Sequence, residues 1–159
     1  MGLLDIENIL ESTDNDIKVI EKYIKSTYNI TGKLDIYKYA DKFIVNCDGS
    51  VNISNSNIDK LDNNIFKWGS VRIFTIYNCN NIQQLKGVPE YCKYFYISDC
   101  NSLKSLKYGP KFVECEYEIR NCKNLHNSHI NTICINITML NCIDDNKFRE
   151  LREYYRRGF

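Results

Sequence analysis

Phe74-Thr-Ile-Tyr-Asn-Cys79 is a short phrase that the chain repeats at nearly constant spacing. Its later copies are Phe95-Tyr-Ile-Ser-Asp-Cys100, Tyr117-Glu-Ile-Arg-Asn-Cys122 and Ile137-Thr-Met-Leu-Asn-Cys142, so the cysteines lie 21, 22 and 20 residues apart. A degenerate copy, Val51-Asn-Ile-Ser-Asn-Ser56, ends 23 residues before Cys79. A period of this length predicts a solenoid, in which stacked coils bury one continuous core.

Each copy begins with two apolar residues separated by one other residue, which predicts a short strand with both apolar side chains facing inward. Further apolar residues follow the cysteine, as Ile82 and Leu85 do after Cys79. Too few residues remain in each period for a long helix, so we expect extended or irregular backbone on the outer side of each coil. Because strands of successive coils run the same way, the sheet should be parallel.

Two coils end with a second signature, Leu103-Lys-Ser-Leu106-Lys-Tyr-Gly109-Pro110, with Gly87-Val-Pro89 at the corresponding place one period earlier, whereas no Gly-Pro turn follows Leu125. This phrase, followed by an aromatic strand, looks like the short leucine-rich-repeat-like proteins of tailed bacteriophages. Similar phrasing occurs in the leucine-rich repeats of bacterial effector ligases. The resemblance covers residues 43–143 and implies a binding scaffold. It implies no catalytic residues.

Residues 1–28 are helical in pattern and lie before the repeats. Residues 3–10 suggest a short amphipathic helix, and residues 12–16 supply an N-cap cluster for a second one. Ile17, Ile20, Ile24 and Tyr28 fall on one face of that second helix. We interpret the segment as a cap over the open end of the core, with an effector-like helical hairpin as the alternative.

Residues 29–50 should hold leading strands, over Lys33–Tyr37 and Phe43–Cys47, with Asp48-Gly49 as a turn into the repeats of residues 51–143. Residues 144–159 predict a C-terminal capping helix, with Phe148, Leu151 and Tyr155 facing inward. The expected fold is therefore α+β: one domain over residues 1–159, a short leucine-rich-repeat-like solenoid with parallel strands and helices at both ends.

Cys79, Cys100, Cys122 and Cys142 form a structural column, which we interpret as reduced, buried thiols inside the coils. Stacked strands are about 4.8 Å apart, whereas bridged Cβ atoms need about 3.8 Å, so a disulfide ladder does not fit. A metal-like grouping exists, but it lacks a close cysteine pair, and we expect no metal or cofactor. Its members are Cys115, Cys122, His126, His129 and Cys134.

Asparagine or aspartate stands directly before the last residue of every copy. Asparagine tolerates left-handed backbone and can bond its neighbours, so these residues should turn the chain out of the strand. Stacked asparagines can also bond one another between coils. They are Asn55, Asn78, Asp99, Asn121 and Asn141.

Composition narrows the classes of function. With 21 basic and 20 acidic residues the net charge is +1, so no global field attracts nucleic acid or a membrane. No apolar run is long enough to span a bilayer, and the start of the chain lacks a secretory pattern, from which we expect a cytoplasmic protein. No catalytic motif is present, so we expect no enzyme.

The outward positions of the strands form two rows, one through Thr75, Tyr96 and Glu118 and one through Tyr77, Ser98 and Arg120. Tyrosine and arginine are enriched at binding hot spots, so Tyr77, Tyr96, Glu118 and Arg120 are the candidate partner-binding residues. An ordinary solvated sheet face is the alternative.

The predicted function is a non-enzymatic protein-binding module, encoded by a phage or virus, that binds and modulates a host protein in the host cytoplasm. Alternatives are a structural or assembly component of a virion and an RNA-binding protein that uses the arginines of the C-terminal helix. The five basic residues of that helix stand against four acidic ones, and the resulting net charge of +1 disfavours nucleic acid as the partner.

Overall fold

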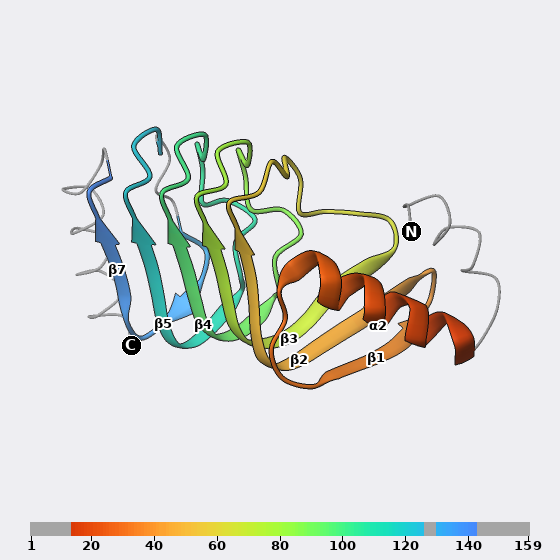
Figure 1. Cartoon of the computed structure of the whole chain (residues 1–159). Helices are drawn as coiled ribbons and strands as arrows, with labels where there is room; N and C mark the ends of the chain where they lie inside the picture. The colour runs from red at the N-terminus through yellow and green to blue at the C-terminus, as the bar shows by residue number, and fades with distance from the viewer. Residues whose placement is uncertain (1–13, 126–129, 143–159) are drawn as a thin grey trace.

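The computed structural model describes residues 14–125 and 130–142, which form one helix and a seven-stranded sheet (Figure 1). The helix is α2 (Asp14–Tyr28). The strands are β1 (Leu34–Tyr39), β2 (Lys42–Ser54), β3 (Phe66–Tyr77), β4 (Tyr91–Ser98), β5 (Phe112–Arg120), β6 (Ile133–Cys134) and β7 (Ile137–Leu140).

The predicted solenoid of stacked parallel strands is confirmed. β2, β3, β4 and β5 pair in parallel in chain order, and β5 also pairs in parallel with both β6 and β7. Figure 1 shows the arrows of β2, β3, β4, β5 and β7 side by side and pointing the same way. Among the described residues, the connections from one parallel strand to the next contain no helix, as the short period requires.

Two inward columns fill the core, and both are in register from β2 to β7. The rings of Phe74 and Phe95 stack with centroids 5.6 Å apart, and Tyr117 continues the stack 5.1 Å beyond Phe95. Every member is buried, because the alternation of the strands points each one into the coil. The columns are Val51, Phe74, Phe95, Tyr117 and Ile137, and Ile53, Ile76, Ile97, Ile119 and Met139.

α2 lies against the N-terminal end of the stack, beside β1 and β2 (Figure 1). Ile20, Ile24 and Tyr28 are buried, and the Tyr28 ring meets Phe66 and Trp68 edge to face at 5.9 and 5.5 Å. Covering the aromatic side chains of the first coils is what a solenoid cap must do. The expected helices over residues 3–10 and 144–157 lie outside the described residues.

The prediction of a turn at Asp48-Gly49 was wrong, because β2 runs through both residues as an irregular strand. The chain reverses instead at Ala40, which has a φ of 56° between the antiparallel strands β1 and β2. Gly49 serves close approach rather than turning: a Cβ there would lie 2.1 Å from the carbonyl oxygen of Thr31. Thr31 pairs with Ser50 through two backbone hydrogen bonds at this point.

The predicted strands were also too short. β3 begins at Phe66, well before the phrase that starts at Phe74, and the added length creates a third inward column. That column alternates thiol and isopropyl side chains: Cys47, Val71, Cys92, Val113 and Cys134.

Candidate functional site

Left-handed turns end the strands and fix the position of the outer face. Asn55, Asn78, Asp99, Asn121 and Asn141 all have φ between 51° and 56°, which confirms the predicted role of this column. Each of the first four donates its backbone N–H to the last strand residue of the next coil, at 2.9–3.0 Å. Since every coil ends at the same height, the residues just before the turns align from coil to coil.

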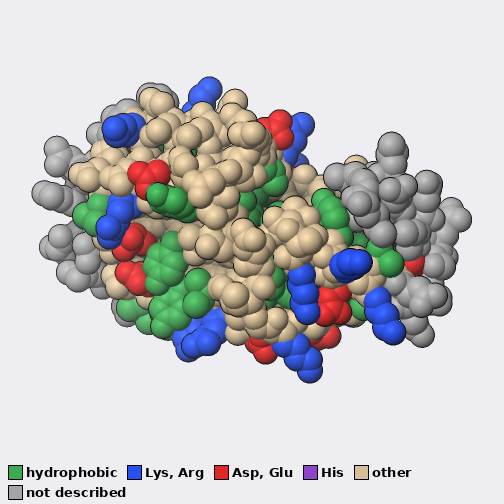
Figure 2. All heavy atoms as spheres, in the orientation of Figure 1, with side chains coloured by type: hydrophobic (Ala, Val, Ile, Leu, Met, Phe, Trp, Pro, Cys, Tyr) green, Lys and Arg blue, Asp and Glu red, His purple; other side chains and the backbone are tan. Residues whose placement is uncertain are grey.

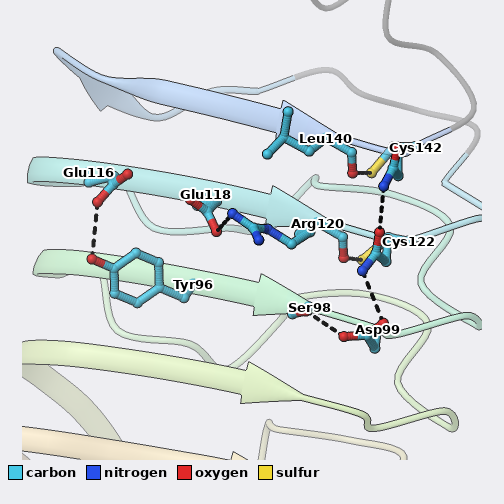
Figure 3. A network of polar contacts seen from close by, with 11 residues as sticks. Tyr96, Ser98, Asp99, Glu116, Glu118, Arg120, Cys122, Leu140 and Cys142 are labelled. Carbon is cyan, nitrogen blue, oxygen red and sulfur yellow. Dashed lines mark hydrogen bonds and ion pairs between the residues drawn. The ribbon is translucent and has the colours of Figure 1, made fainter.

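Side chains of the same column bond between coils, as predicted. Asn78 donates to Asn55 at 2.7 Å, Asn121 donates to Asp99 at 3.2 Å, and Asn141 donates to Asn121 at 3.0 Å (Figure 3). A carboxylate cannot donate, so Asp99 accepts from Asn121 and, at 2.6 Å, from the Ser98 hydroxyl. The ladder therefore has one acceptor-only position, directly beside the outer face of β4.

The cysteine column lies on the inner side of these turns. All eight cysteines are free, and Cys79, Cys100, Cys122 and Cys142 are buried. Each thiol donates to the carbonyl oxygen two residues before it, at 3.3–3.5 Å. Burial raises the pKa of Cys100 to about 11, and a hydrogen bond with the Cys142 thiol, followed by burial, raises the pKa of Cys122. These groups are therefore neutral thiols at pH 7.

The remaining members of the metal-like grouping are Cys115, Cys134, His126 and His129. Cys134 is buried and donates to the Asn136 carbonyl oxygen at 3.3 Å, while Cys115 is half-buried on β5. His126 and His129 lie outside the described residues. Within residues 14–125 and 130–142 no group of three or more histidine, cysteine, aspartate or glutamate residues could hold a metal ion.

The two predicted outward rows are in register across the stack. The first contains Asn52, Thr75, Tyr96, Glu118 and Thr138, and the second contains Ser54, Tyr77, Ser98, Arg120 and Leu140. The structure thus brings the four candidate residues together on β3, β4 and β5. Figure 2 shows hydrophobic side chains beside acidic and basic ones on this face.

The four candidates are held in different ways. The Arg120 guanidinium forms an ion pair with Glu118 at 3.1 Å along the same strand (Figure 3). The Tyr96 hydroxyl donates to the Glu116 carboxylate at 3.1 Å, and burial, followed by this hydrogen bond, raises the pKa of Tyr96 to about 12. Tyr77 has 44% of its surface exposed. The surface therefore offers a free phenol ring, a bonded one and an ion pair.

Sequence reasoning missed Tyr94 and Glu116, which belong to the same surface. They pair in register across β4 and β5, and the Tyr94 ring stacks on Tyr96 with centroids 6.2 Å apart. Alternation about the inward Phe95 places Tyr94 on the outer face with Tyr96, but Tyr94 precedes the repeated phrase, which starts at Phe95. The usable signal was the aromatic residue itself, two positions before Tyr96 on the same strand.

A hollow of about 380 Å³ lies elsewhere, on the side of the return turns. Lysine ammonium groups line it, but its carboxylates already bind them: Glu90 pairs with Lys67 at 3.4 Å and with Lys111 at 3.1 Å, and Asp62 pairs with Lys86 at 3.7 Å. These pairs are solvent-exposed, so each contributes little to stability. The hollow shares no residue with the outer face of the sheet described above.

Comparison with family models, with curated proteins and with solved structures finds no match for the chain. In the part of the chain that the structure describes, no helix is long and apolar enough to cross a membrane.

Proposed function

We propose that the protein is a non-enzymatic binding module that recognises another protein through the outer face of β3, β4 and β5. The observation that carries this proposal is the register of the two outward rows. It gathers Tyr77, Tyr96 and the pair Glu118 and Arg120, from three separate stretches of the sequence, on three adjacent strands. We name this set, together with Tyr94 and Glu116, the tyrosine face.

Three properties of the tyrosine face support binding. Its aromatic and arginine side chains are the types that contribute most energy at protein interfaces. Its backbone is fixed by sheet hydrogen bonds and by the asparagine ladder, so a partner would meet a surface that needs little ordering on binding. Each outward residue lies beside the equivalent residue of the next coil, and solenoids build extended binding surfaces from such rows.

The leucine-rich-repeat-like class and the viral setting belong to the same proposal. The period of the cysteine phrase and the Gly-Pro turn at residues 109–110 support the class. We propose a phage or virus as the source and a host protein as the partner, because a small binding scaffold without catalytic motifs acts by occupying a surface of another protein.

Capture of partners from host lysate tests the proposal with a matched control. The double variant Tyr77→Ala/Tyr96→Ala should weaken binding at least ~30-fold, since two hot-spot rings contribute about 2 kcal/mol or more. The control is Tyr37→Ala/Tyr39→Ala on β1, whose rings are exposed to 47% and 71% but lie outside the tyrosine face. Normal binding by the first variant and loss with the second would place the interface on β1 and refute the proposal.

A further inference from the structure

Glu116 is a carboxylate with no ion-pair partner among the described residues. It is half-buried on β5, and one of its oxygens, Oε2, accepts the Tyr96 hydroxyl at 3.1 Å. No lysine or arginine of residues 14–125 and 130–142 forms an ion pair with it. The nearest outward arginine along the strand, Arg120, is held by Glu118 at 3.1 Å (Figure 3).

Aromatic rings adjoin this carboxylate. Tyr94 lies opposite Glu116 in the sheet register, and Tyr96 lies opposite Glu118. The two rings are nearly parallel, at 17°. They flank the buried Phe95 on β4, so the alternation of the strand places both rings on the outer face. A ring face with a carboxylate beside it attracts a cation both through the ring quadrupole and through charge.

We propose that the Tyr94, Tyr96 and Glu116 cluster is a receptor for an arginine side chain of the partner protein. The inference rests on the proposed function and names the chemistry of the partner residue that docks at the centre of the tyrosine face. The guanidinium stacks on the tyrosine rings and donates to the free oxygen of Glu116.

Arginine fits this cluster better than lysine does. Its guanidinium is planar, stacks on aromatic faces and presents several donors in a fixed plane, whereas an ammonium is a compact and strongly hydrated charge. Among the charged side chains that precede the cluster on these strands, Arg72 on β3 and Lys93 on β4 are cationic and Glu114 on β5 is anionic. With Glu116 the charges of this group sum to zero, so a guanidinium meets no net repulsion from them, and Glu116 is the carboxylate that is hydrogen-bonded to the Tyr96 hydroxyl.

The test uses a defined probe rather than the unidentified partner. The peptide acetyl-Gly-Arg-Gly-amide is titrated into isotope-labelled protein, and amide shifts are recorded. Acetyl-Gly-citrulline-Gly-amide has the same shape without the charge. We expect shifts at residues 94–96 and 116–118 with the arginine peptide, and apparent binding at least ~5-fold weaker with the citrulline peptide.

Glu116→Gln should weaken arginine-peptide binding at least ~5-fold. Glu114→Gln, which removes the same charge from an exposed position two residues earlier, should leave it within ~2-fold. Melting curves of both variants should match the wild type. Equal shifts with both peptides, shifts that map elsewhere, or equal effects of the two glutamine variants would overturn the arginine receptor.

The two proposals fail separately. Arginine-dependent shifts at this cluster, combined with unchanged partner capture by Tyr77→Ala/Tyr96→Ala, would refute the proposed function and leave the cluster as an arginine-binding site that the captured partner does not use. Loss of partner capture by that variant, combined with no arginine-dependent shift, would refute only the arginine receptor.

Discussion

The inner and outer faces of β3, β4 and β5 use the same strands but follow different rules. Inside, each coil repeats the same apolar positions, so phenylalanine stacks on phenylalanine and isoleucine on isoleucine. Outside, the positions in one row change from Thr75 to Tyr96 to Glu118. The repeated face holds the coils together, and the varied face is free to recognise a partner. Changes on the two faces should therefore have separable effects.

Phe95→Ala and Tyr96→Ala are the strongest test of this separation, because they are neighbours that point to opposite faces. Phe95 is fully buried between Phe74 and Tyr117, so its truncation should lower the free energy of unfolding by about 3–5 kcal/mol. Tyr96 is half-buried on the surface, and its truncation should cost about 1 kcal/mol or less. Chemical denaturation of both variants measures the difference, and equal losses would contradict the division into two faces.

The inner face was largely predictable from the sequence, and the outer face was only partly so. The inward position of a residue such as Phe74 or Cys79 is recognisable in the sequence. Each coil must fill the same interior space, so similar residue types recur at the same place in every repeat. The left-handed Asn and Asp column was recognisable for the same reason, since few residue types adopt positive φ at low cost.

Tyr94 and Glu116 were missed because the predicted strands began one residue later, at Phe95 and Tyr117. Gly49 was misread because its role depends on a distant segment of the chain. Asp48-Gly49 has the composition of a typical turn. Gly49 is needed instead because the backbone of Thr31, from a distant segment, lies where the Cβ of any other residue would be. Contacts of this kind follow from the assembled structure, and not from local patterns.

Alkaline pH should destabilise the inner face first, because the ordinary pKa of its thiols, 9.0, lies below the value of 10.0 from which Tyr96 on the outer face is raised. Burial raises the pKa of Cys92 to about 12 and of Cys100 to about 11, against 9.0 for an unperturbed thiol. A group with a raised pKa in the folded state contributes fully below pH 9, and its contribution is lost as pH rises toward the folded value. Above pH 9 the unfolded chain binds fewer protons, so stability should fall by at most about 1.4 kcal/mol per pH unit per thiol.

Denaturant titrations at pH 7, 9 and 10.5 measure this dependence. Cys100→Ala removes one of the two groups, so its stability curve should be flatter above pH 9 even though its stability at pH 7 is lower. A wild-type free energy of unfolding that stays constant from pH 7 to 10.5 would contradict the buried thiol column.

Tyr117→Phe should have the smallest effect and the opposite sign. Tyr117 is the one tyrosine in a column of apolar residues. Its buried hydroxyl has no hydrogen-bond partner among the described residues, and burial raises its pKa. The oxygen lies against the return turn, 3.3 Å from the place that a Cβ on Gly109 would occupy. Removing a buried polar group that lacks a partner avoids its desolvation cost, so the variant should be neutral or more stable by about 1 kcal/mol.

The reciprocal change gives the control for this prediction. Phe95→Tyr adds a hydroxyl in the preceding coil, where Val88 stands at the turn position that corresponds to Gly109. The free energy of unfolding of that variant should fall by about 1–3 kcal/mol, because the new hydroxyl is buried in a packed site. Thermal unfolding of the two variants side by side measures both signs. A loss of more than about 1 kcal/mol in the free energy of unfolding of Tyr117→Phe would mean that the Tyr117 hydroxyl has a partner in the folded protein. This coil would then require tyrosine in the column and would not tolerate every aromatic ring.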